Sequence, residues 1–85
     1  MKRSLPDTNA LSRFFAGDEK VFRFLAESDK ILLSIFVLGE LYTGFKGGNK
    51  EKQNLQLLED FIIKNNVEIL DATKTTAEIF ASIKN

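Results

Sequence analysis

Two acidic residues stand where this sequence would bring them to one edge of a small sheet. Asp7 ends a short apolar run through Pro6 and precedes Thr8 and Asn9, which both favour helix starts. Glu40 lies about one and a half turns into the helix expected after a second apolar run. Carboxylates about 5 Å apart repel by roughly 3 kcal/mol at an effective dielectric near 20, unless a cation lies between them. The pair therefore predicts a divalent metal site.

The chemistry open to such a pair is narrow. Oxygen ligands suit Mg²⁺ or Mn²⁺, which keep several waters and accept phosphate oxygens, so the reaction class indicated is phosphodiester hydrolysis by a metal-activated water. Glycosidases also pair two acids, but nothing in the sequence indicates the sugar cleft they need. The chain has no Cys and no His, which excludes zinc fingers, thiol or imidazole catalysis, haem ligation and disulfide scaffolds.

Composition describes an ordinary globular chain. Its 85 residues suffice for one small domain of modest stability, and 12 basic residues balance 12 acidic ones, so no overall charge marks a nucleic-acid-coating protein. No apolar run approaches the roughly 18 residues of a membrane span, and no secretory leader is visible. We therefore expect no membrane association and a cytoplasmic location.

The elements that would hold the two acids alternate along the chain. Strands are expected at residues 2–6, 31–33 and 67–70, and helices at 10–16, 19–28, 35–46 and 50–64, with a last helix after 71–75. This β-α-α-β-α-α-β-α order predicts a three-layer α/β/α fold around a short parallel sheet. The carboxyl ends of its strands converge at one edge, where Asp7 and Glu40 would meet.

Several local signals refine this outline. Gly17 is expected to end the first helix, and Asp18 and Ser34 to cap the helices that follow them. Gly39 and Gly44 inside the third helix suggest close backbone approach. In the second helix, Val21, Phe22, Leu25 and Ala26 share a predicted packing face, and Thr75 with Glu78 forms a possible capping box for the last helix.

The motifs carry a family resemblance. Residues 5–12 (LPDTNALS), 31–34 (ILLS) and 38–44 (LGELYTG) are similar to the PIN domain, specifically the VapC-type toxins of bacterial toxin–antitoxin systems. The resemblance implies a dimeric endoribonuclease that depends on Mg²⁺ or Mn²⁺, cleaves RNA and is held inactive by a cognate antitoxin. It also implies that Asp7 and Glu40 are catalytic, metal-binding acids, and that Thr8 or Asn9 orients a metal-bound water or the Asp7 carboxylate.

Two departures from the family pattern qualify this expectation. The family's third acid, its common fourth acid and its later strands have no counterpart here, so residues 1–85 resemble a single, incomplete PIN-like domain truncated after the helix that follows the third strand. Metal affinity and activity are then expected to be impaired. The second departure is Pro6, which stands in the expected first strand. The resemblance implies strand order 3-2-1-4-5, so the first strand becomes an edge, where proline is tolerated.

Each candidate also has a purely structural interpretation. In this interpretation Asp7 caps the first helix, Glu40 is a solvated helix acid, and Thr8 and Asn9 favour capping over metal chemistry. The phenylalanines recur at helical spacing, which indicates core or dimer packing, and the loop at residues 46–50 is either solvated or an RNA phosphate contact. The alternative function is accordingly a non-catalytic PIN remnant that serves as a dimerisation or antitoxin-binding module.

Overall fold

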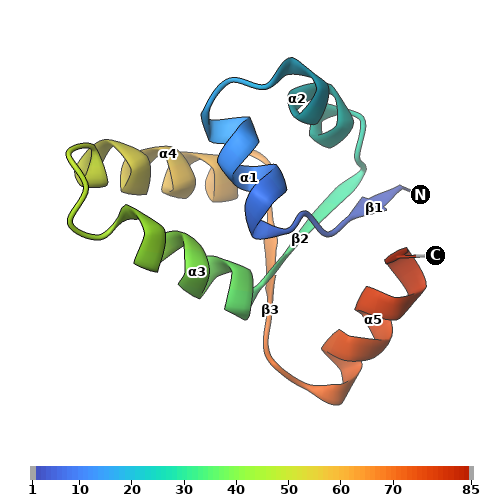
Figure 1. The fold of residues 1–85 in the computed structure, drawn as a ribbon. Coiled ribbons are helices and arrows are strands. Elements are labelled where there is room, and N and C mark those ends of the chain that lie inside the picture. The colour runs from blue at the N-terminus through green and yellow to red at the C-terminus, as the bar shows by residue number, and fades with distance from the viewer. Residues whose placement is uncertain (1, 85) are drawn as a thin grey trace.

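The computed structural model describes residues 2–84 (Figure 1). Strand β1 spans Arg3–Ser4, β2 spans Lys30–Ser34 and β3 spans Glu68–Leu70. The helices are α1 (Thr8–Phe15), α2 (Glu19–Ala26), α3 (Ile35–Phe45), α4 (Glu51–Lys64) and α5 (Lys74–Lys84). The order of elements is the one predicted, with a pair of helices in each strand-to-strand connection.

The strands form a parallel sheet in the order β1-β2-β3. Ser4 pairs with Ile31, and Leu33 pairs with Ile69. Because both connections step in the same direction across the sheet, right-handed crossovers put α1 to α4 on one face. Figure 1 shows these helices gathered on one side of the strands and α5 on the other. The three-layer α/β/α fold and the edge position of β1 are therefore confirmed.

The main core lies between β2 and the helices of the first face. Every one of α1 to α4 contributes a buried side chain to it, so all four helices are held against the same sheet surface by apolar burial. The buried cluster comprises Leu11, Leu25, Ile31, Leu33, Leu41, Leu58 and Phe61. The Phe14 ring centroid lies 5.0 Å from that of Phe61, which confirms core packing for part of the phenylalanine set.

Strand β2 is buried on both of its faces, as its uninterrupted apolar run predicted. Leu33 belongs to the main core and is 0% exposed, whereas Leu32, on the opposite face, is also buried at 4% exposure. On that second face Ser34 pairs with Leu70 of β3. The central strand is thus enclosed on both faces, and α3 begins directly after it at Ile35.

Helix ends follow the predicted chemistry in most places. Asp18 accepts hydrogen bonds from the backbone N–H groups of Lys20 and Val21, and Ser34 accepts one from the backbone of Phe36. Gly17 has φ +92°, a left-handed conformation that glycine adopts without strain, directly after the C-cap of α1.

The cap of α5 differs from the prediction. Thr73, not Thr75, accepts a hydrogen bond from a helix N–H, that of Thr76, with 3.2 Å between nitrogen and oxygen. Thr75 lies inside the helix, because α5 already begins at Lys74. The capping-box prediction was wrong because spacing alone does not reveal where the chain leaves β3 and first turns.

Two packing predictions were also wrong. A Cβ at Gly39 or Gly44 would meet no atom within 4 Å, so neither glycine permits a close backbone approach. On α2, Leu25 is buried, but Phe22 is 58% exposed and Ala26 is exposed as well, so the predicted packing face is narrower than its apolar pattern. Helical spacing identifies one side of α2, but only the neighbouring elements decide how much of it is covered.

Pro6 lies outside the sheet. Strand β1 ends at Ser4, two residues earlier than predicted, and Pro6 is a buried residue of the connection to α1. Proline therefore removes no hydrogen bond from the strand ladder, and tolerance at a sheet edge is not needed to explain it. Within residues 2–84, no helix combines the length and apolarity needed to cross a membrane.

Candidate functional site

Asp7 is the N-cap residue of α1. Its backbone is extended, with φ −86° and ψ 177°, and its Oδ1 accepts a hydrogen bond from the backbone N–H of Ala10 at 2.8 Å. The helix begins at Thr8, so Thr8 and Asn9 are its first residues and not its caps. The expectation that they cap α1 was wrong, and the capping interpretation of Asp7 is correct. Asp7 nevertheless remains solvent-exposed.

Glu40 lies in the middle of α3 and is also exposed. Helix α3 starts directly at the end of β2, where Ser34 caps it, so its first half stands at the carboxyl edge of the sheet. The Thr8 hydroxyl donates a hydrogen bond to Glu40 Oε1 at 2.8 Å. The structure thus brings Glu40 to the residue that follows Asp7.

The contact that Thr8 makes is one that the sequence did not predict. Its hydroxyl contacts Glu40, whereas the sequence suggested an orienting contact with the Asp7 carboxylate or with a metal-bound water. Among the hydrogen bonds of residues 2–84, none involves the Asn9 side chain, which is exposed. A Thr–Glu pair separated by 32 residues has no local spacing signal, so sequence analysis could not have found this contact.

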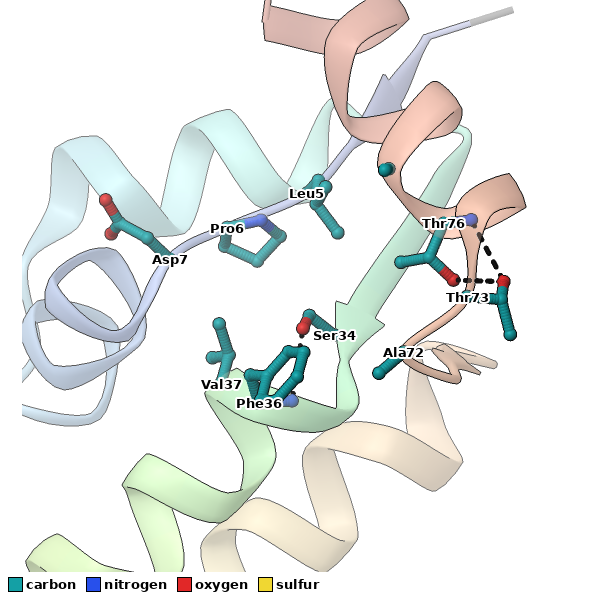
Figure 2. Close-up of a pocket in the computed structure, with 10 residues that line it drawn as sticks. Leu5, Pro6, Asp7, Ser34, Phe36, Val37, Ala72, Thr73 and Thr76 are labelled. Carbon is teal, nitrogen blue, oxygen red and sulfur yellow. Dashed lines mark hydrogen bonds between the residues drawn. The ribbon is translucent and has the colours of Figure 1, made fainter.

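An open hollow of about 570 Å³ adjoins Asp7 (Figure 2). Its walls come from the segments that follow each of the three strands, so it occupies the crevice expected at the carboxyl edge of a parallel sheet. The lining is mostly apolar: Leu5, Pro6, Asp7, Ser34, Phe36, Val37, Ala72, Thr73, Thr76 and Ala77.

Polar groups at the hollow are engaged within the protein. The Thr76 hydroxyl donates to the backbone oxygen of Asp71, and Thr73 accepts from the Thr76 backbone. Figure 2 shows the Asp7 carboxylate directed away from Leu5 and Pro6. Asp7 therefore lines the hollow with its carboxylate turned away from Leu5 and Pro6, and Glu40 is not among the lining residues. Sequence analysis did not predict that residues of α5 line the hollow, although it expected the third strand to end at the same edge of the sheet.

The oxygens of the two acids suit a hard divalent cation. Asp7 Oδ1 and Glu40 Oε1 each accept one hydrogen bond, while among the described residues no hydrogen bond engages Asp7 Oδ2 or Glu40 Oε2. Carboxylate oxygens are the type of ligand that hard divalent cations accept, with water completing the coordination. In the part of the chain described, no group of three or more acids is arranged to hold a metal ion.

These features define a class of protein: an α/β domain with a carboxylate-bearing crevice at the carboxyl edge of a parallel sheet. The PIN domain family profile matches residues 4–85. The chain therefore belongs to the PIN domain family, which has a nuclease-type fold and generally uses divalent metals. Comparisons with curated proteins and with solved structures give no significant match.

Proposed function

We propose that this PIN domain is an endoribonuclease of the VapC toxin type, which cleaves RNA phosphodiesters with Mg²⁺ or Mn²⁺. The observation that supports it best is the hydrogen bond of 2.8 Å from Thr8 to Glu40, since it joins the residue after Asp7 to the second acid. The proposed setting is the cytoplasm, with an RNA substrate and a cognate antitoxin as partners.

Asp7 and Glu40 are the proposed metal-binding residues. Each offers one carboxylate oxygen that no described residue engages, and both are exposed, so a hydrated ion and a phosphate can reach them. A bound divalent ion would supply activation of water and neutralisation of phosphate charge. Two carboxylates form a weak site, because each further anionic ligand adds to affinity and to positioning, so we expect low activity.

The first prediction concerns Asp7→Asn. Asn caps helices about as well as Asp but lacks the anionic oxygen, so α1 should persist while metal-dependent RNA cleavage is lost. Cleavage of a fluorescent RNA with Mg²⁺, with and without a chelator, measures this. Asp18→Asn is the matched control, because Asp18 caps α2 in the same way, through its side-chain oxygen. Cleavage that survives both Asp7→Asn and chelation would contradict the proposal.

A second candidate function is a non-catalytic module that binds a second copy or an antitoxin. It is favoured by the exposure of large apolar side chains on α2, where Phe22 is 58% and Phe24 is 52% exposed. We expect a dimer in sedimentation equilibrium that Phe22→Ser with Phe24→Ser converts to a monomer. Ile63→Ser is the control, because Ile63 is 74% exposed on α4. A monomeric wild-type chain would exclude the dimer.

A further inference from the structure

Glu40 needs a constraint if its carboxylate is to stay at the site. It is exposed on α3, and a solvated glutamate samples several rotamers about three side-chain torsions. The one hydrogen bond that its side chain makes within the described residues is the one Oε1 accepts from Thr8. The orientation of Glu40 therefore depends on this donor.

Thr8 is well suited to act as a fixed donor. Its backbone is set by two hydrogen bonds that Asp7 accepts, from Ala10 N to Oδ1 at 2.8 Å and from Leu11 N to the carbonyl oxygen at 3.1 Å. Leu11, on the same helix, is 0% exposed and belongs to the main core. Threonine is also branched at Cβ, which restricts its χ1 rotation. The hydroxyl is thus carried by a rigid helix start.

The position of Thr8 in the helix leaves its hydroxyl free to reach α3. Within a helix, a threonine hydroxyl commonly donates to the backbone carbonyl four residues earlier, as Thr43 does to Gly39 at 2.9 Å. Thr8 is the first residue of α1, so the carbonyl four residues earlier belongs to Ser4 of β1 and not to the helix. Its hydroxyl is directed to Glu40 instead.

We propose that Thr8 is a positioning residue that holds the Glu40 carboxylate beside Asp7 before any ion or substrate binds. The effect of this positioning on metal binding rests on the proposed function, but the positioning of Glu40 by Thr8 is a property of the metal-free protein. Three variants separate the effect of the Thr8 hydroxyl from the effects of side-chain shape and of losing a different hydroxyl. Thr8→Val removes the hydroxyl at nearly constant shape, Thr8→Ser keeps it, and Thr43→Val removes a hydroxyl from α3 that donates to the Gly39 carbonyl oxygen.

The decisive measurement is made on the full chain without metal. Three-bond NMR couplings report rotamer averaging about χ1 and χ2 of Glu40. We expect a single dominant rotamer in the wild type, Thr8→Ser and Thr43→Val, and averaged couplings in Thr8→Val. Unchanged couplings in Thr8→Val, equal averaging in Thr43→Val, or a failure of Thr8→Ser to keep the wild-type value would each overturn the proposal.

Mn²⁺ titration followed by electron paramagnetic resonance tests the consequence. Loss of the residue that orients a metal ligand commonly weakens binding 10- to 100-fold, so we expect Thr8→Val to bind Mn²⁺ at least about 10-fold more weakly, with Thr8→Ser unchanged. Equal Mn²⁺ affinity in the wild type and Thr8→Val would overturn the role of Thr8 at the site. A wild type that binds no Mn²⁺ but shows the expected couplings would refute the proposed function and leave the positioning intact.

Discussion

At the scale of single residues, the observed capping role of Asp7 is compatible with the metal binding proposed for it. Its Oδ1 accepts the Ala10 N–H, and this hydrogen bond fixes the direction of the carboxylate at the start of α1. The second oxygen, Oδ2, accepts no hydrogen bond from the described residues, and it is the oxygen proposed to bind an ion. The two interpretations of Asp7 that the sequence left open therefore describe different oxygens of one group.

Because the cap hydrogen bond uses only Oδ1, the effect of Asp7 substitutions on the free energy of unfolding can be predicted. Asp7→Ala removes the cap acceptor and should lower the free energy of unfolding by about 1 kcal/mol, whereas Asp7→Asn should change it by only a few tenths. Urea denaturation followed by circular dichroism measures both variants in metal-free buffer. Equal losses in Ala and Asn would mean that the charge, and not the cap hydrogen bond, stabilises α1.

At the scale of elements, a glycine can be required by its backbone conformation or by a close neighbour, and the two cases can be told apart here. Gly17 and Gly39 both have open space where a Cβ would stand, yet Gly17 has φ +92° and Gly39 lies within helix α3. Only the first position requires glycine for its backbone. Helix α3, from which Glu40 projects, therefore carries an unfavourable residue that no close contact explains.

Opposite effects are predicted for alanine at these two positions. Gly39→Ala should stabilise the protein by up to about 1 kcal/mol, because alanine favours helix and meets no neighbour. Gly17→Ala should destabilise it by about 1 kcal/mol or more, because a Cβ strains a left-handed backbone. In a domain of this size, each corresponds to a midpoint shift of roughly 4–8 °C in thermal unfolding. Stabilisation by both alanines would contradict the φ argument.

At the scale of the whole molecule, the sheet order brings the site together. Strand β2 lies between β1 and β3, so the segments that follow all three strands share one edge. The hollow is lined from all three, and Thr8 and Glu40 approach each other across the first two. The core beneath β2 therefore supports the geometry of the candidate site as well as the fold.

The central strand should accordingly be the most sensitive position. Leu33 is 0% exposed in the main core, so Leu33→Ala should cost about 2–5 kcal/mol through lost burial and the cavity left behind. A small domain has little stability to spare, so this variant should be largely unfolded at 37 °C. Leu57→Ala is the control, because Leu57 is 41% exposed on α4 and should change stability little. A folded Leu33→Ala protein with cooperative, near-wild-type melting would contradict this account.

Sequence by itself determined the order of elements and the α/β class, and it singled out Asp7 and Glu40 as the candidate acids. Apolar runs of different period mark strands and helices, and caps such as Asp18 and Ser34 are chosen by local hydrogen bonding. These signals depend on interactions between residues close together in the chain, so they can be recognised from a single sequence.

Tertiary structure alone decided which partner each site group meets. Thr8 donates to Glu40, 32 residues away, and this contact depends on how α1 and α3 pack on the same sheet face. The cap at Thr73 and the exposure of Phe22 likewise depend on chain path and on neighbouring elements. Residue types and spacing carry no information about such contacts, because packing between distant segments sets them.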